Sequence, residues 1–187
     1  MKVSLGDKVC LYPMPTTIVG ATVNGKPNFI TIAHVGIMNF SSLSIGMNKI
    51  HYTNAGIKEN ETFSVNIPSE GLVTETDYCG LVSGKYEDKG SLFEIFYGTL
   101  ETAPMIKACP INMECKLINV VDFPKHDVFV GEIVETHIDE QCLTDGAMDI
   151  LKVRPILYTS AEKQYWKLGE AGPSPTGWRR RGTLERH

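Results

Sequence analysis

The chain has 187 residues, 42% of them hydrophobic and 21% charged, as expected of one globular domain with a small appendage. Its 18 Lys and Arg against 22 Asp and Glu give a net charge of −4, which argues against binding to nucleic acid, because a phosphate backbone needs a basic face. The sequence shows neither an apolar run long enough to cross a membrane nor a secretory signal at its start, so we expect a cytoplasmic protein.

The first part of the chain predicts antiparallel strands joined by a tight turn. Residues 16–23 are rich in β-branched side chains, and Asn24-Gly25 is a strong hairpin-turn signal. Residues 28–35 supply the second strand, and residues 42–45 a third, shorter one. This start indicates a β-hairpin rather than a strand–helix–strand unit.

Two short helices and a fourth strand follow. Residues 52–61 contain helix formers, with Thr53 or Asn54 as possible N-caps. Residues 63–67 alternate apolar and polar side chains and predict a strand. The spacing of apolar residues over 70–81 favours a second helix, which a polar loop follows.

The rest of the chain is mostly strand. Two long segments, 112–121 and 127–138, are joined by a loop that carries His126, and residues 154–158 predict a last short strand. We therefore expect a mainly β domain over residues 1–168, a Greek-key β-barrel with short helices at its rim. Residues 169–187, with three arginines at 179–181, are expected to be an extended or partly disordered tail.

Local catalytic signatures are absent from the sequence. There is no Gly-x-Ser-x-Gly, His-Glu-x-x-His or Walker loop, and the absence of Gly-x-Gly-x-x-Gly removes the Rossmann route to a dinucleotide. Five cysteines lack zinc-binding spacing, so we expect reduced thiols and no metal site, with Cys79 packed in a helix. His34 alternates with apolar neighbours, which favours a structural histidine.

The order of several short motifs is more informative than any one of them. These motifs are Pro13-Met14-Pro15, residues 25–33, Tyr52-Thr53-Asn54, residues 63–68, Asp77-Tyr78-Cys79-Gly80, Ser83-Gly84-Lys85, Asp88-Lys89, Glu114-Cys115 and His126-Asp127. In this order the chain resembles the flavin reductase-like family with the FMN-binding split-barrel fold, most closely its flavoredoxin-type members. The resemblance implies a homodimer with FMN in a groove near the subunit interface.

The resemblance assigns the FMN phosphate to the first helix and the polar loop. It places Thr53 at the phosphate, where hydroxyl, amide and free helix N–H groups converge, with Asn54 and Ser44 as further donors. Lys89 is preferred over Lys85 as the cation because Asp88-Lys89 is the matched pair. The alternatives are an ordinary helix cap and solvated lysines.

The flavin ring is assigned to the second strand and to side chains from later segments. The strand residues expected to line the ring are Asn28, Ile30, Thr31, Ile32 and Ala33. For Asn28 a turn-stabilising role is the alternative, and for Thr31 a simple strand-forming one.

Later side chains complete the expected ring site. His126 is placed close to the flavin as a catalytic hydrogen-bond donor, although loop histidines usually face solvent. Tyr158 and Tyr165 are expected to flank the cofactor, with core or interface aromatics as the alternative. Ile37-Met38 stands where flavoredoxin-like relatives can carry a tryptophan, and neither Trp166 nor Trp178 is assumed to replace it.

The resemblance leaves two functions open. The first is an oxidoreductase that passes electrons from NAD(P)H through bound FMN to a flavin, a ferric complex or a protein acceptor. The alternative is a flavoredoxin-type electron carrier that binds FMN but does not itself oxidise NAD(P)H. An oxidase of the pyridoxamine-phosphate type would need an anionic-substrate pocket, and the arginines cluster only in the tail.

Overall fold

The structure is a computed structural model that describes residues 1–172. Trp178 and the three arginines at 179–181 lie outside the described residues, and the boundary at residue 168 stays a prediction. Within residues 1–172, no helix combines the length and the apolar character that crossing a bilayer requires.

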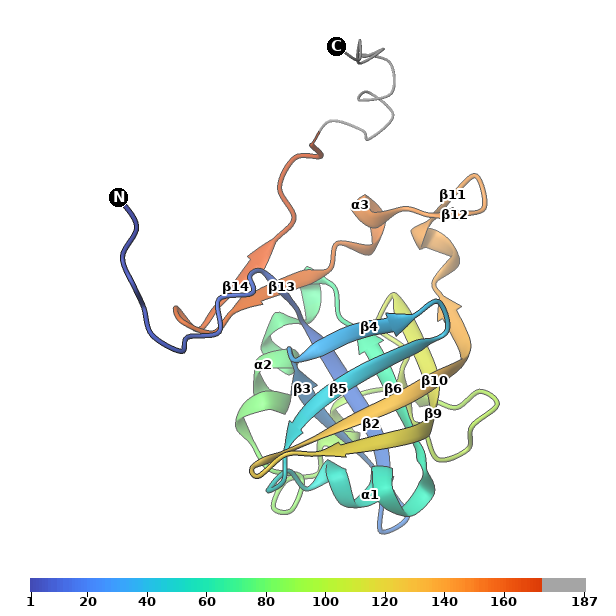
Figure 1. Ribbon diagram of the computed structural model, residues 1–187. Coiled ribbons are helices and arrows are strands. Elements are labelled where there is room, and N and C mark those ends of the chain that lie inside the picture. The colour runs from blue at the N-terminus through green and yellow to red at the C-terminus, as the bar shows by residue number, and fades with distance from the viewer. Residues whose placement is uncertain (173–187) are drawn as a thin grey trace, which may run out of the picture.

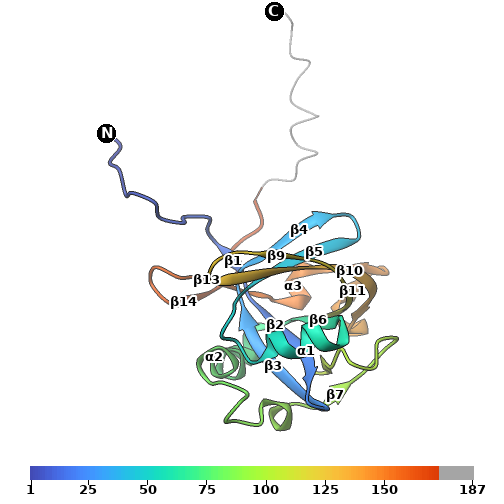
Figure 2. The same ribbon diagram turned by 60° about the horizontal axis from the view of Figure 1, so that its bottom comes forward.

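A curved, fully antiparallel sheet of seven strands forms the body of the molecule (Figures 1 and 2). Its strand order is β3-β2-β6-β9-β10-β5-β4. The strands are β2 (Thr17–Val23), β3 (Lys26–Ile32), β4 (Val35–Asn39), β5 (Ser42–Asn48), β6 (Thr62–Ile67), β9 (Ile111–Asp122) and β10 (His126–Ile138). Because β6 lies between β2 and β9, and β10 pairs with β5, strands distant in sequence are neighbours. The mainly β prediction is confirmed.

Smaller elements lie around this sheet. A three-stranded sheet has the order β1-β13-β14, and two short hairpins pair β7 with β8 and β11 with β12. Their bounds are β1 (Met14–Pro15), β7 (Ile95–Phe96), β8 (Met105–Ile106), β11 (Leu143–Thr144), β12 (Ala147–Met148), β13 (Ile156–Thr159) and β14 (Gln164–Lys167). The helices are α1 (Thr53–Asn60), α2 (Val73–Leu81) and α3 (Ile150–Val153), with 3₁₀ turns η1 (Glu70–Leu72), η2 (Lys89–Leu92) and η3 (Glu140–Cys142).

The predicted first hairpin is present. Asn24 and Gly25 have φ angles of 51° and 74°, the left-handed backbone that a two-residue turn of this kind requires. The turn sets the pairing of β2 with β3, in which Val23 lies opposite Lys26. The predicted second strand is too long, however: β3 ends at Ile32, and the chain then turns into β4, which the sequence did not predict. His34 lies exposed at this break, so its prediction as a structural core histidine is wrong.

Helix α1 starts where the sequence predicts, but its predicted cap is wrong. The cap residue is Tyr52, and no side chain caps the first turn. Thr53 and Asn54 lie inside the helix and are buried. Their polar groups contact other elements: Thr53 accepts a hydrogen bond from Asn28, and Asn54 donates one to the carbonyl of Asn48. The side chains of Thr53 and Asn54 thus bond to β3 and to the end of β5 instead of capping the helix.

The two long strands β9 and β10 match their predicted segments closely. His126, however, is the first residue of β10 rather than a loop residue, because only three residues separate the two strands. In the β10–β5 pairing His126 lies opposite Asn48. The pairing therefore brings His126 to the end of β5, next to the segment that leads into α1.

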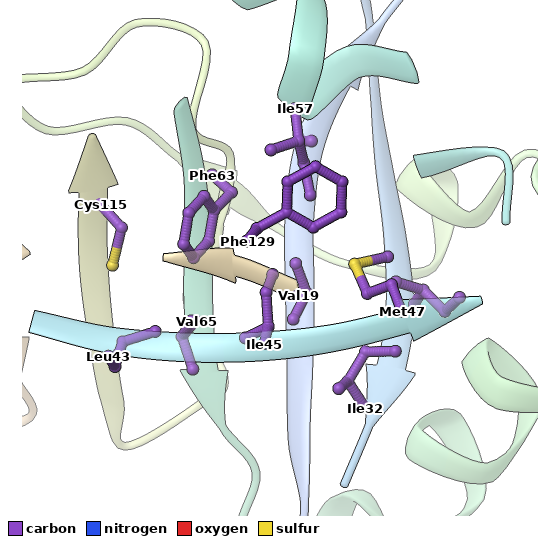
Figure 3. Close-up of a cluster of buried hydrophobic side chains, with 12 residues drawn as sticks. Val19, Ile32, Leu43, Ile45, Met47, Ile57, Phe63, Val65, Cys115 and Phe129 are labelled. Carbon is purple, nitrogen blue, oxygen red and sulfur yellow. The ribbon is translucent and has the colours of Figure 1, made fainter. Parts of the chain in front are cut away.

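Apolar side chains from the sheet and from α1 fill the interior. Figure 3 shows Phe63, Phe129 and Ile57 converging with aliphatic residues from β2, β3 and β5. These three side chains are completely buried. Their burial supplies the main driving force for closing the sheet around one core.

Candidate functional site

A main cavity of about 420 Å³ opens between the end of β3, helix α2, the end of β5 and the β1-β13-β14 sheet. This volume is within the range of small-molecule sites. Six of the residues predicted from the sequence line it: Thr31, Ile32, Ala33, His126, Tyr158 and Tyr165. They come from β3, the following turn, β10, β13 and β14, so the fold brings together residues more than 120 positions apart.

His51 is the residue of this cavity that the sequence analysis missed. It lines the wall beside His126, and its Nδ1 is buried without a hydrogen-bond partner among the described residues. Burial lowers the pKa of His51, and the nearby charges of His126 and Lys89 lower it further. A neutral imidazole therefore lines the cavity, and one of its ring nitrogens is buried and unpaired within residues 1–172. The only sequence signal was its position two residues before Thr53.

Two tyrosines form an aromatic wall on another side of the cavity. The rings of Tyr158 and Tyr165 lie 5.2 Å apart between centroids, and both line the cavity. The hydroxyl of Tyr165 donates a 3.0 Å hydrogen bond to Oδ1 of Asp77 on α2. Burial and this carboxylate raise the pKa of Tyr165 above its ordinary range, so the phenol stays protonated. Trp166, half exposed on β14, is not part of the cavity wall.

Lys89 is buried, unlike the solvated loop lysine that was the alternative. It is only 2% exposed, and its ammonium donates hydrogen bonds to the carbonyl oxygens of Cys79 (3.1 Å) and Val82 (3.0 Å). Burial lowers the pKa of Lys89. An ammonium has three N–H donors, and these carbonyls take two of them. Lys89 lines a side cavity of about 340 Å³ rather than the main cavity.

The other predicted polar residues lie around the side cavity and the start of α1. Asn28 and the exposed Lys85 line the side cavity with Lys89. Nδ2 of Asn28 lies 2.7 Å from Oγ1 of Thr53. Asn54 donates to the carbonyl of Asn48, and its own Oδ1 has no partner within residues 1–172. Through these two hydrogen bonds, the start of α1 contacts Asn28 in the wall of the side cavity and Asn48 in the wall of the main cavity.

Two predicted residues lie elsewhere. The side chain of Ile30 packs in the hydrophobic core instead of the cavity wall. Ser44 lines an apolar groove of about 690 Å³ that runs along the N-terminal segment, and this groove shares Ala33, His34 and His126 with the main cavity. Ile30 shares a face of β3 with Ile32, so strand alternation could not have separated these two residues; Ile30 lies deeper in the core.

Cys79 is buried on α2, as predicted. Burial raises the pKa of its thiol to about 11, so the thiolate is scarce at neutral pH. The site therefore has no activated nucleophile here, and its polar groups are suited to binding and orienting a ligand.

A known protein family and several solved structures are similar to this chain over most of its length. The profile of the family "Flavin reductase like domain" matches residues 9–167. The chain is similar to flavoredoxin from Methanosarcina acetivorans (46% identity, TM-score 0.91, 94% of this chain and 95% of that one) and to flavoredoxin of Desulfovibrio vulgaris (Miyazaki F) (35%, 0.87, 94% and 97%).

A more distant similarity concerns the fold alone. It is to an FMN-binding protein from Thermus thermophilus with bound 1-cyclohex-2-enone (23% identity, TM-score 0.77, 94% of this chain and 97% of that one). The chain therefore belongs to the flavin reductase-like family and has that family's split-barrel fold.

Proposed function

We propose that this protein is an FMN-binding electron carrier of the flavoredoxin type. The observation that carries the proposal is the similarity to two flavoredoxins over almost the whole chain, at 46% and 35% identity. The sequence alone favours an NAD(P)H-dependent oxidoreductase over the carrier, whereas the comparisons favour the carrier. The expected homodimer and cytoplasmic location remain part of the proposal.

The main cavity has the chemistry that a flavin needs. An isoalloxazine ring requires an apolar slot with a few hydrogen-bonding groups at its edge. Ile32, Ala33 and the Tyr158 ring provide the apolar walls, and His51 and His126 provide imidazoles. The unsatisfied Nδ1 of His51 is the clearest sign that the protein alone does not complete this site.

The phosphate assignment rests on the start of α1 and on Lys89. The hydroxyl of Thr53 accepts from Asn28, a contact that does not use the Thr53 O–H. Lys89 contributes a nearby positive charge and one remaining N–H donor, because two carbonyl groups occupy the other two. These residues would bind the phosphate by charge-assisted hydrogen bonds.

Bound FMN would supply electron transfer, one or two electrons at a time. The residues of the chain bind and orient it. The Tyr158 and Tyr165 rings, tilted by 49° to each other, would shield one side of the flavin. His126 would hydrogen-bond the ring or a partner molecule, and the neutral His51 would line the site without adding charge. No side-chain nucleophile is required.

A second candidate is an NAD(P)H-dependent flavin reductase that passes electrons to a flavin, a ferric complex or a protein. The apolar groove favours it, because the groove meets the main cavity at Ala33, His34 and His126. A nicotinamide ring bound in the groove would lie beside a flavin ring bound in the main cavity. Positioning of the two rings would supply most of the rate.

The visible spectrum separates these functions. We expect the purified chain, soaked in FMN and desalted, to keep an absorbance band near about 450 nm. Under anaerobic conditions, a carrier is bleached by dithionite or a partner reductase but not by NADH or NADPH, whereas a reductase is bleached by one of these nucleotides. A protein that retains no flavin contradicts both functions. His126→Ala tests the site, and Lys125→Ala, one residue away and exposed, is its matched control.

A further inference from the structure

The first twelve residues, here called the arm, have the pattern of a strand. Apolar side chains occupy the odd positions Met1, Val3, Leu5, Val9 and Leu11, and the even positions lack large aliphatic side chains. The alternation is interrupted at Asp7, which follows Gly6 with its φ of 70°. Alternation of this kind is typical of a strand with one buried face. In the structure, however, Val3, Leu5, Val9 and Leu11 are between 66% and 81% exposed.

The arm has no strand partner within residues 1–172. The first strand, β1, begins only at Met14. Figures 1 and 2 both show the arm extending away from the sheet. Its end is held by the hydroxyl groups of Tyr12 and Ser160, which lie 2.8 Å apart, and Val9 and Leu11 line a groove with Val35 and Phe123. The apolar face of the arm is nevertheless largely exposed.

A surface that fits such a strand lies on β4. This strand is at the edge of the main sheet and pairs only with β5, so its other edge is open. The apolar side chains of Ile37, Met38 and Phe40, here called the hairpin patch, are exposed, Ile37 by 87%. An open edge beside exposed apolar side chains is a typical site for strand addition.

We propose that the arm of one copy of this chain adds as a strand to β4 of a second copy and covers its hairpin patch. Each copy carries one arm and one hairpin patch, so in a twofold dimer the arm of each copy covers the patch of the other. A twelve-residue extended segment reaches about 40 Å, enough to cross to a neighbouring subunit. The inference rests on the homodimer of the proposed function but does not require flavin.

This exchange would also affect the cofactor site. Val9 and Leu11 line the apolar groove, which shares His34 and His126 with the main cavity. An arm held by the second copy would withdraw Val9 and Leu11 from this groove and open it beside His34 and His126. Retention of FMN is therefore expected to depend on the pair.

Cys10 provides a natural probe of the exchange. It lies on the arm and is the exposed member of the five cysteines, since the other four are buried. We would mix the unaltered chain with a larger, tagged chain carrying Cys10→Ser and Ile37→Cys, and treat the mixture with a short bismaleimide. The expected product is a cross-linked pair of one chain of each size. A tagged chain carrying Cys10→Ser and Tyr86→Cys, in the exposed loop after α2, is the control and should not cross-link.

No cross-link between the two chains in a dimeric sample would overturn the exchange. So would a cross-link within a single chain, tested with a variant that keeps Cys10 and carries Ile37→Cys. Charge placement gives an independent measurement. Val9→Lys with Leu11→Lys puts charge on the apolar face, and we expect the dissociation constant of the pair to rise about 100-fold. Ser4→Lys with Cys10→Lys puts the same charge on the opposite face and should change it by less than about threefold.

Sedimentation at several concentrations separates the possible failures. If the unaltered protein is monomeric throughout, both the homodimer and the arm exchange are wrong, while FMN binding is judged separately from the spectrum. If the protein is dimeric and the apolar-face variant pairs as tightly as the control, only the arm placement is wrong.

Discussion

Nδ2 of Asn28 donates a 2.7 Å hydrogen bond to Oγ1 of Thr53, which joins β3 to the first turn of α1. Both side chains are buried. Because the Thr53 oxygen accepts this bond, the contact with Asn28 does not use the Thr53 O–H. One contact thus orients a predicted phosphate donor and stabilises the packing of α1 on the sheet.

Thr53→Ala should weaken FMN binding by about 10- to 100-fold, since a hydrogen bond to a charged group contributes about 1.5–3 kcal/mol. Thr53→Ser keeps the hydroxyl and should retain most of the affinity. Fluorescence titration of FMN with each variant measures the effect. Equal affinities for all three proteins would show that Thr53 has a structural role only.

Lys89→Met should destabilise the fold by about 1–3 kcal/mol, because the buried carbonyls of Cys79 and Val82 lose their donor. FMN affinity should fall as well if Lys89 provides charge to the phosphate. Lys85→Met is the matched control, since Lys85 is exposed, and should leave stability nearly unchanged. Urea unfolding and FMN titration separate the two effects. A stable Lys89→Met variant would contradict the buried contacts.

Glu114 should make stability depend on acid pH. Burial by itself would raise its pKa, but hydrogen bonds from His137 and from the backbone of Leu100 and Thr99 hold the pKa below its ordinary value of 4.5. The stabilisation is therefore present above about pH 4.5 and is lost as the pH falls through the folded-state pKa. Urea midpoints measured between pH 7 and pH 3 should fall for the native chain. Glu114→Gln should flatten that fall, whereas Glu132→Gln, exposed on β10, should not.

Thiol labelling should distinguish Cys10 from the buried cysteines. Burial raises the pKa of Cys79 to about 11 and those of Cys109 and Cys115 to about 12, so few thiolates form and the reagent has no access. We expect one reactive thiol in the folded protein at pH 8 and five in denaturant, measured with a chromogenic disulfide reagent. Rapid labelling of a second cysteine would show that the core opens locally.

Gly131→Ala should destabilise the barrel by about 1–3 kcal/mol. A Cβ at this position would lie 2.5 Å from Cζ of Phe63, so the Phe63 ring from β6 packs against β10 only because residue 131 has no side chain. Phe63→Leu added to Gly131→Ala should recover part of the loss by removing ring atoms. Thermal unfolding of the single and double variants checks this, and additive losses would exclude the contact.

The local features of the fold were determined by the sequence alone. Asn24-Gly25 defined the first hairpin because only a few residue types adopt positive φ at both turn positions, and alternation or helical spacing marked β6, β10 and the helix over 70–81. Motif order along the chain was enough to identify the family. The bend after Ile32 escaped prediction because neither Ala33 nor His34 is a turn-forming residue, and β-branched Val35 follows them.

The site was decided only by the tertiary structure. His126 meets His51 because β10 pairs with β5, a contact between segments more than 70 residues apart. Lys89 faces two carbonyls at the end of α2, a partnership that no sequence spacing encodes. Turns and alternation depend on neighbouring residues and can be read from a sequence, whereas the partners of a side chain depend on strand crossovers, which only the folded chain defines.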